Sequence, residues 1–135
     1  MLIALSLAVT LAAAAAPAPP PADPAEARYS PAYDKCLDKP EGQSTAGMIG
    51  CADDEGKVQD AALNAAYRKA MKDLNPRQKA KLLAAQRAWI AFRQAECASY
   101  EDEDWGTLSR VLAAGCFLHM TVVRVIDLES YPPGT

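Results

Sequence analysis

Few side chains in this sequence could take part in catalysis. Hydrolases with a serine or cysteine nucleophile need an imidazole beside it, and the chain has one histidine, His119. Helical periodicity places His119 on the buried stripe of its helix, which favours a core histidine with a local hydrogen bond. Acids that could act as a pair occur at 53–55 and 101–104, but runs of adjacent acids usually form a solvated surface. We therefore predict that the chain is not an enzyme and has no cofactor.

Four cysteines, Cys36, Cys51, Cys97 and Cys116, could bind zinc or form disulfides. Zinc sites in small domains commonly contain Cys-x-x-Cys pairs, and the cysteines here are much farther apart. An even number of cysteines in an exported domain of this size favours disulfide bonds. We therefore predict no metal site, and disulfides that each add about 3 kcal/mol to the stability.

The predicted elements are helices separated by proline and glycine, and no segment has the pattern of a strand. Ser30 can cap a short helix that starts at Pro31. Asn75 and Pro76 end one long helix and begin the next with almost no loop. The predicted helices cover residues 31–38, about 45–74, 76–100, and 107 to the stop at 131. The predicted buried stripe of the fourth helix consists of Leu108, Val111, Leu112, Gly115, His119, Val122 and Ile126.

This order of helices predicts an all-α fold: a disulfide-stapled antiparallel helical hairpin with a short N-terminal helix and a long fourth helix across it. Cys51 and Cys97 lie 24 and 22 residues from Asn75. At a rise of about 1.5 Å per residue, both cysteines lie at the same end of the hairpin. Short loops bring Cys36 and Cys116 to that end too.

Two sets of disulfides are compatible with this geometry. The sequential set is Cys36–Cys51 with Cys97–Cys116, and the crossed set is Cys51–Cys97 with Cys36–Cys116. We prefer the sequential set, because each of its bonds closes a helix-loop-helix segment that must fold back in any case.

The third predicted helix contains the stretch from Leu82 to Cys97, which has the residue types of a helix-helix interface. At helical spacing, Leu82, Gln86, Trp89, Arg93 and Cys97 share one side. We predict that Arg93 forms a partly buried ion pair with Glu55 of the second helix and so fixes their register. A ligand-binding Arg93 is the alternative. The residues of this predicted structural motif are Glu55, Gln86, Arg87, Trp89 and Arg93.

The acidic turn after the third helix is the candidate surface for a partner. An aromatic side chain flanked by acids suits contact with a basic protein. The alternative is a Trp105 that folds onto the end of the bundle. The candidate partner-binding residues are Glu101, Asp102, Glu103, Asp104 and Trp105.

The beginning of the chain resembles a secretory signal. Residues 2–16 are an apolar run of signal-peptide length, followed by small residues and prolines, although no lysine or arginine precedes Arg28. An anchoring or buried N-terminal helix is the alternative. The expected boundaries are a signal peptide at 1–16, a linker at 17–29, a helical domain at 30–131 and a tail at 132–135. The mature chain is expected in the periplasm or secreted, without stable membrane insertion.

Charge excludes one class of partner. The net charge is −3 and the pI is near 5.1, which argues against nucleic-acid binding. The sequence makes no prediction of the oligomeric state.

Three motifs resemble the LprI-type N-terminal domain family of exported bacterial proteins. The family patterns are LN-x-x-Y, AQRAW-I-x-[FY]-R-x-x-x-C and C-x4-T-x-x-R. The resemblance covers about residues 33–128 and adds Arg124 to the structural motif. The matching positions are Leu63, Asn64, Tyr67, Ala85, Gln86, Arg87, Ala88, Trp89, Ile90, Phe92, Arg93, Cys97, Cys116, Thr121 and Arg124.

The resemblance implies a function in the cell envelope. The family takes its name from a lipoprotein that inhibits lysozyme, so a basic lysozyme is the implied partner. The alternative is an envelope binding or structural module without lysozyme activity. Because the signal region has no cysteine to lipidate, the exported chain is expected to be soluble.

Overall fold

The structure is a computed structural model and describes residues 23–132. The expected signal peptide, residues 17–22 of the expected linker and residues 133–135 lie outside this range. Within this range every element of regular secondary structure is a helix, which confirms the predicted all-α fold class. The α-helices are α1 (Pro31–Leu37), α2 (Thr45–Lys72), α3 (Pro76–Ala98) and α4 (Leu108–Glu129), and the 3-10 helices are η1 (Glu26–Arg28), η2 (Pro40–Gln43) and η3 (Glu103–Trp105).

Local signals in the sequence set the starts of α1 and α3. The Ser30 hydroxyl accepts a hydrogen bond from the Tyr33 amide at 3.3 Å and caps α1. At the start of α3, the Asn75 side chain accepts from the Gln78 amide at 3.0 Å, and the Gln78 side chain accepts from the Asn75 amide at 2.9 Å. This capping box satisfies two amides that have no partner inside the helix. The chain therefore reverses between α2 and α3 within three residues.

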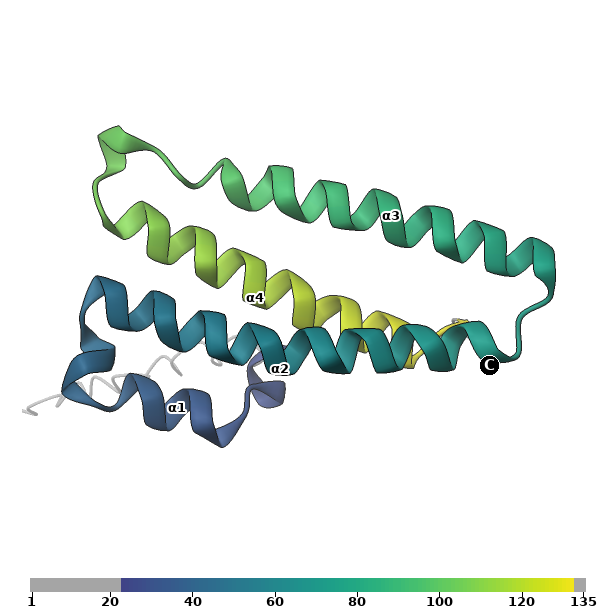
Figure 1. Ribbon diagram of the computed structural model, residues 1–135, viewed down its shortest axis with the longest axis horizontal. Helices are drawn as coiled ribbons and strands as arrows, with labels where there is room; N and C mark the ends of the chain where they lie inside the picture. Colours follow the sequence, from purple (N-terminus) through teal and green to yellow (C-terminus); the bar gives the residue numbers. More distant parts are fainter. Residues whose placement is uncertain (1–22, 133–135) are drawn as a thin grey trace, which may run out of the picture.

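The fourth helix occupies the space between the two arms of the hairpin. Figure 1 shows α4 between α2 and α3, and the most extensive contact between helices is that of α2 with α4. α3 packs on α4 and has little backbone contact with α2. The sequence predicted that α4 crosses the hairpin; instead it separates the arms, which diverge from the turn toward the cysteine end.

Two apolar clusters hold this arrangement. The first lies near the α2–α3 turn and joins all three long helices; its buried members are Leu63, Ala66, Ala70, Leu82, Val125 and Leu128. The second lies farther along α2 and α4; its buried members are Ala25, Ala52, Leu118 and Val122. Alanines in both clusters let α2 approach α4 closely, which explains why this pair has the larger contact.

The segment before α1 is part of the folded domain. Ala25 is completely buried. The carbonyl of Arg28 accepts a hydrogen bond from Gln59 at 3.0 Å, and the Arg28 guanidinium forms a two-bond ion pair with Glu129 at 2.8 and 2.9 Å. Residues 23–29, which the expected boundaries place in the linker, therefore pack on α2 and α4. The proline-rich composition concealed this, because a single buried alanine leaves no periodic signal.

The predicted faces agree with the structure for α3 and differ for α4. In α3, Leu82, Gln86, Arg93 and Cys97 are buried as predicted. In α4, Leu108 and Leu112 of the predicted stripe are 56% and 50% exposed. The residues that α4 buries are Ser109, Ala113, Leu118, Thr121, Val122, Val125 and Leu128. The reason is that α4 packs against helices on two sides, so its buried surface does not follow one stripe.

Of the helices in the described range, α4 alone is long and apolar enough by composition to cross a membrane. The core helix of a water-soluble protein passes the same test.

Candidate functional site: the cysteine end of the bundle

Both disulfides lie at the end of the molecule away from the α2–α3 turn. Cys36 is bonded to Cys51 with Cα atoms 5.8 Å apart, and Cys97 to Cys116 with Cα atoms 5.5 Å apart. This is the sequential set. The first bond ties α1 to α2, and the second ties the end of α3 to α4. Met120 packs its sulfur 3.7 and 3.8 Å from the two sulfurs of the second bond.

Arg93 is the central polar residue between α3 and α4. Its side chain is 9% exposed. The guanidinium carbon lies 4.7 Å from the centre of the Trp89 ring and 3.9 Å from that of Phe117. Arg93 donates a hydrogen bond to the Thr121 hydroxyl at 2.6 Å, and its other contact is Asp60 at 3.5 Å. Cation–π contacts and one strong hydrogen bond thus compensate most of the cost of burying this charge.

The predicted ion pair of Arg93 with Glu55 is wrong. Glu55 is 2% exposed and faces the N-terminal segment. Its carboxylate accepts hydrogen bonds from the Ser30 amide at 2.9 Å, the Ser30 hydroxyl at 2.5 Å and the Gln59 side chain at 2.7 Å. The prediction assumed that α2 and α3 face each other, but α4 lies between them. Thr121 and Phe117 of α4 contact Arg93, and the acid of α2 that reaches it is Asp60 at 3.5 Å, not Glu55.

The remaining residues of the structural motif divide into two groups. Arg124 donates to the Gln86 side chain at 3.0 Å, and its guanidinium lies 5.8 Å from the Trp89 ring. These three residues therefore extend the Arg93 network along α3 and α4. Arg87 is exposed on the other side of α3. Gln86, Trp89, Arg93 and Arg124 of the motif thus form a contact between α3 and α4.

Sequence reasoning missed two members of this network, Asp60 and Phe117, and it named Thr121 only as a position of the third motif. The spacing of Cys116 and Thr121 in the third motif was a signal, because it places a hydroxyl a little more than one turn beyond the disulfide. Nothing in the sequence indicated that this hydroxyl would face Arg93. Phe117 follows Cys116 directly and belongs to no motif.

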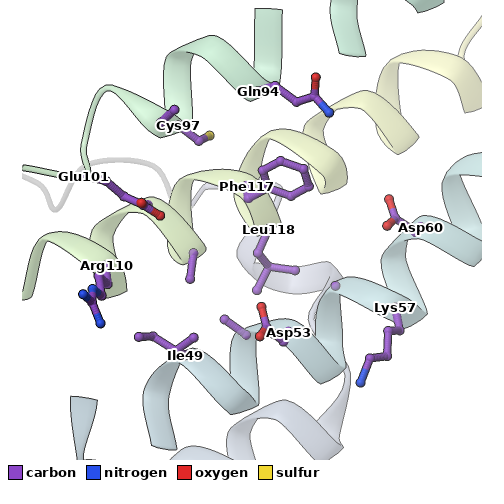
Figure 2. Close-up of a pocket in the computed structure, with 15 residues that line it drawn as sticks. Ile49, Asp53, Lys57, Asp60, Gln94, Cys97, Glu101, Arg110, Phe117 and Leu118 are labelled. Carbon is purple, nitrogen blue, oxygen red and sulfur yellow. The ribbon is translucent and has the colours of Figure 1, made fainter. Parts of the chain in front are cut away.

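A groove of about 780 Å³ opens where α3 diverges from α2 and α4. Figure 2 shows Phe117 and Leu118 of α4 between Gln94 and Cys97 of α3 on one side and Asp53, Lys57 and Asp60 of α2 on the other. The centre of the groove is apolar and its edges are charged. This combination is typical of a binding surface.

The charged edge of the groove is mainly acidic. Lys57 donates to Asp54 at 2.6 Å. This hydrogen bond and the nearby carboxylates raise the pKa of Lys57 above its ordinary value of 10.5. Asp54 therefore balances the lysine charge locally. Of the other charged groups at the edge, Asp53 and Glu101 outnumber Arg110, so the edge is slightly negative.

The acidic turn continues the groove outward. A second hollow of about 570 Å³ lies on it and shares Glu101 and Arg110 with the groove. The turn depends on Gly106, whose φ of 70° disfavours other residues.

All five candidate partner-binding residues are exposed, and Trp105 is 58% exposed instead of folded onto the bundle. Leu108 and Leu112, one helical turn apart on α4, add apolar surface beside the turn. We call this region the disulfide-end surface; it consists of Glu101, Asp102, Glu103, Asp104, Trp105, Leu108 and Leu112.

The single histidine of the chain does not contribute to the groove. His119 is half-exposed instead of buried, with its Nδ1 atom 3.6 Å from the Asp23 carboxylate. It does not line the groove. Between residues 23 and 132, no group of three His, Cys, Asp or Glu side chains could hold a metal ion.

Comparison with known proteins gives one family match. The family model described as "Lysozyme inhibitor LprI" matches residues 36–128. A protein of Rhizobium meliloti (strain 1021), described as uncharacterized, is 32% identical over 94 residues, which is 58% of this chain and 67% of that protein. No solved structure matches.

Proposed function

Because the chain belongs to the lysozyme inhibitor LprI family, we propose that it is an exported protein that binds a lysozyme and blocks it. The observation that carries this proposal beyond the family is the exposed Trp105 directly after a run of four acids. Export through the segment 1–16, with the boundaries given above, is part of the proposal. N-terminal sequencing of the exported chain checks the cleavage site.

The disulfide-end surface has the composition of a protein-binding site. Binding energy at interfaces is concentrated in a few aromatic and large apolar residues surrounded by polar ones. Trp105, Leu108 and Leu112 supply the apolar part, and the acids of the turn supply the surrounding charge. A basic partner would be attracted by these acids, so its association should be fast and sensitive to salt.

The disulfide between Cys97 and Cys116 supports this function mechanically. It closes a segment of 19 residues that contains the whole acidic turn. A surface that is ordered before it binds loses less conformational entropy on binding. Inhibition would then follow from covering the lysozyme cleft, without any chemical step.

One observation favours the alternative, an envelope binding module whose partner is not a lysozyme. The motif residues Gln86, Trp89 and Arg93 hold α3 on α4. Membership of the family therefore reports the scaffold more directly than the binding surface. The two functions share a surface and differ in the partner.

A lytic assay on cell walls distinguishes them. We expect the purified protein to slow at least one strongly basic lysozyme at about micromolar concentration. We expect Trp105→Ala to weaken the inhibition about tenfold or more, since buried aromatic residues dominate interface energies. Phe92→Ala is the matched control: Phe92 is 56% exposed, on α3 and outside the disulfide-end surface.

The possible outcomes test the lysozyme partner and the disulfide-end surface separately. No inhibition of any lysozyme type would refute the lysozyme proposal and leave the binding module. Inhibition that Trp105→Ala leaves unchanged would refute the proposed surface while keeping the function.

A further inference from the structure

The opposite end of the molecule, at the α2–α3 turn, carries an unassigned cluster of positive charge. Between residues 61 and 95 the chain has a single acid, Asp73. Five of the cations near the turn are exposed and Lys79 is partly buried. We call this cluster the basic tip; it consists of Arg68, Lys69, Lys72, Arg77, Lys79 and Lys81.

The cations of the basic tip are not used within the fold. None of the ion pairs formed among residues 23–132 includes any of them. The two acids in the last turn of α4 are engaged with other cations: Glu129 pairs with Arg28, and Asp127 lies 3.9 Å from Arg124. Six positive charges therefore lie within about two helical turns on either side of the chain reversal, five of them exposed, with Asp73 as the one acid among them.

The net charge of −3 differs in sign from the local charge at this end of the molecule. α2 has 28 residues, so it is about 42 Å long at 1.5 Å per residue. Screening at physiological salt acts over about 8 Å. The acidic cysteine end is thus several screening lengths away from the basic tip. The electrostatic potential around the tip is therefore positive, despite the negative net charge of the chain.

We propose that the basic tip docks the protein, end-on, on the surface of a bilayer that contains anionic phospholipids. Charge complementarity is the main argument. The tip lies at one end of the molecule and has cations on two helices, so it can present several of them to a plane of headgroups at once. Leu83, 38% exposed and one helical turn after Lys79, adds an apolar contact of the kind that the interface of a bilayer accepts.

This docking is independent of the proposed inhibition and compatible with it. An anionic surface would repel the acidic cysteine end, so the molecule would stand with the disulfide-end surface pointing away from the bilayer. That orientation leaves Trp105 free for a partner in solution.

Vesicle co-sedimentation with the full chain tests the proposal. The vesicles are phosphatidylcholine alone and phosphatidylcholine mixed with phosphatidylglycerol. The apolar segment 2–16 is uncharged, so we expect it to contribute equally to binding on both kinds of vesicle. The difference in binding between the two kinds therefore measures the contribution of the basic tip. We expect tighter binding to the anionic vesicles, and a Lys72→Gln/Lys81→Gln variant to lose about thirtyfold of it, because each lysine near such a surface contributes about a factor of five.

Lys35→Gln/Lys39→Gln is the matched control. It changes the net charge equally, and both lysines are exposed at the cysteine end. We expect it to bind like the unmodified chain. Equal losses in both variants, or equal binding to both kinds of vesicle, would overturn the proposal. If duplex DNA at low concentration displaces the protein from the vesicles, the ligand of the basic tip is a nucleic acid instead of a bilayer. If the protein forms oligomers that the Lys72→Gln/Lys81→Gln variant does not form, the partner of the tip is a second copy of the chain.

Discussion

Arg93 shows how a single buried charge can define a helix-helix contact. Its guanidinium lies between the Trp89 and Phe117 rings and donates to Thr121, while its Nε atom has no partner in the described part of the chain. A buried cation contributes to specificity when every alternative packing would leave it unpaired. The planar group matters as much as the charge, because only a flat cation can contact two rings and a hydroxyl together.

At the residue scale we therefore predict that Arg93→Lys destabilises the protein by about 2 kcal/mol, which is the value of a desolvated cation–π contact. Urea unfolding with both disulfides intact measures the change. Arg87→Lys on the same helix is the control and should lie within about 0.5 kcal/mol of the unmodified protein, as exposed substitutions usually do. Similar values for the two variants would mean that Arg93 stabilises only through its charge.

At the element scale, the start of each helix and the buried side of α3 could be predicted from the sequence. Pairs such as Asn75–Pro76 act locally, so the chain reversal does not depend on the rest of the fold. The position of α4 could not be predicted in this way. Leu112 and Leu118 are equally apolar, and periodicity alone does not show that α4 would pack on both sides and leave Leu112 at the surface.

The same limit explains why the partners of Glu55 and the burial of Ala25 were not predicted. Glu55 lies on the predicted inner stripe, but its partner Ser30 comes from a segment whose prolines indicated a linker. Which cation or amide reaches a buried carboxylate depends on tertiary packing, and no local pattern encodes it. The candidate site was more accessible to prediction, because the run of acids around Trp105 cannot be buried cheaply.

The two disulfides should differ in what they hold. α3 depends on α4 for its packing, and Cys97–Cys116 fastens its free end there. We predict that Cys97→Ala/Cys116→Ala costs about 3 kcal/mol and speeds amide hydrogen exchange in the second half of α3. Cys36→Ala/Cys51→Ala, which opens a loop of similar length, should cost about as much and leave exchange in α3 unchanged. Exchange that rises equally along α2 and α3 in both variants would contradict this division.

At the scale of the whole molecule, charge is separated along the long axis. The basic tip occupies the end where α2 turns into α3 (Figure 1), and most acids lie toward the cysteine end. Such a separation costs little folding stability, because the charges of each end are exposed and screened from the other. It gives the molecule two surfaces of opposite sign, which is the physical basis of both proposals made above.

The separation itself predicts the behaviour of the protein on ion exchangers. At pH 7, above the pI near 5.1, a uniformly charged protein would bind only to a quaternary ammonium resin. At low salt we expect this protein to be retained on a sulfonate resin as well. Lys72→Gln/Lys81→Gln should shorten retention on the sulfonate resin, and Glu101→Gln/Glu103→Gln should shorten it on the ammonium resin. The contrary result is a shift that follows net charge alone. In that case Glu101→Gln/Glu103→Gln would lengthen retention on the sulfonate resin as much as Lys72→Gln/Lys81→Gln shortens it, and the two ends would not act as separate charged surfaces.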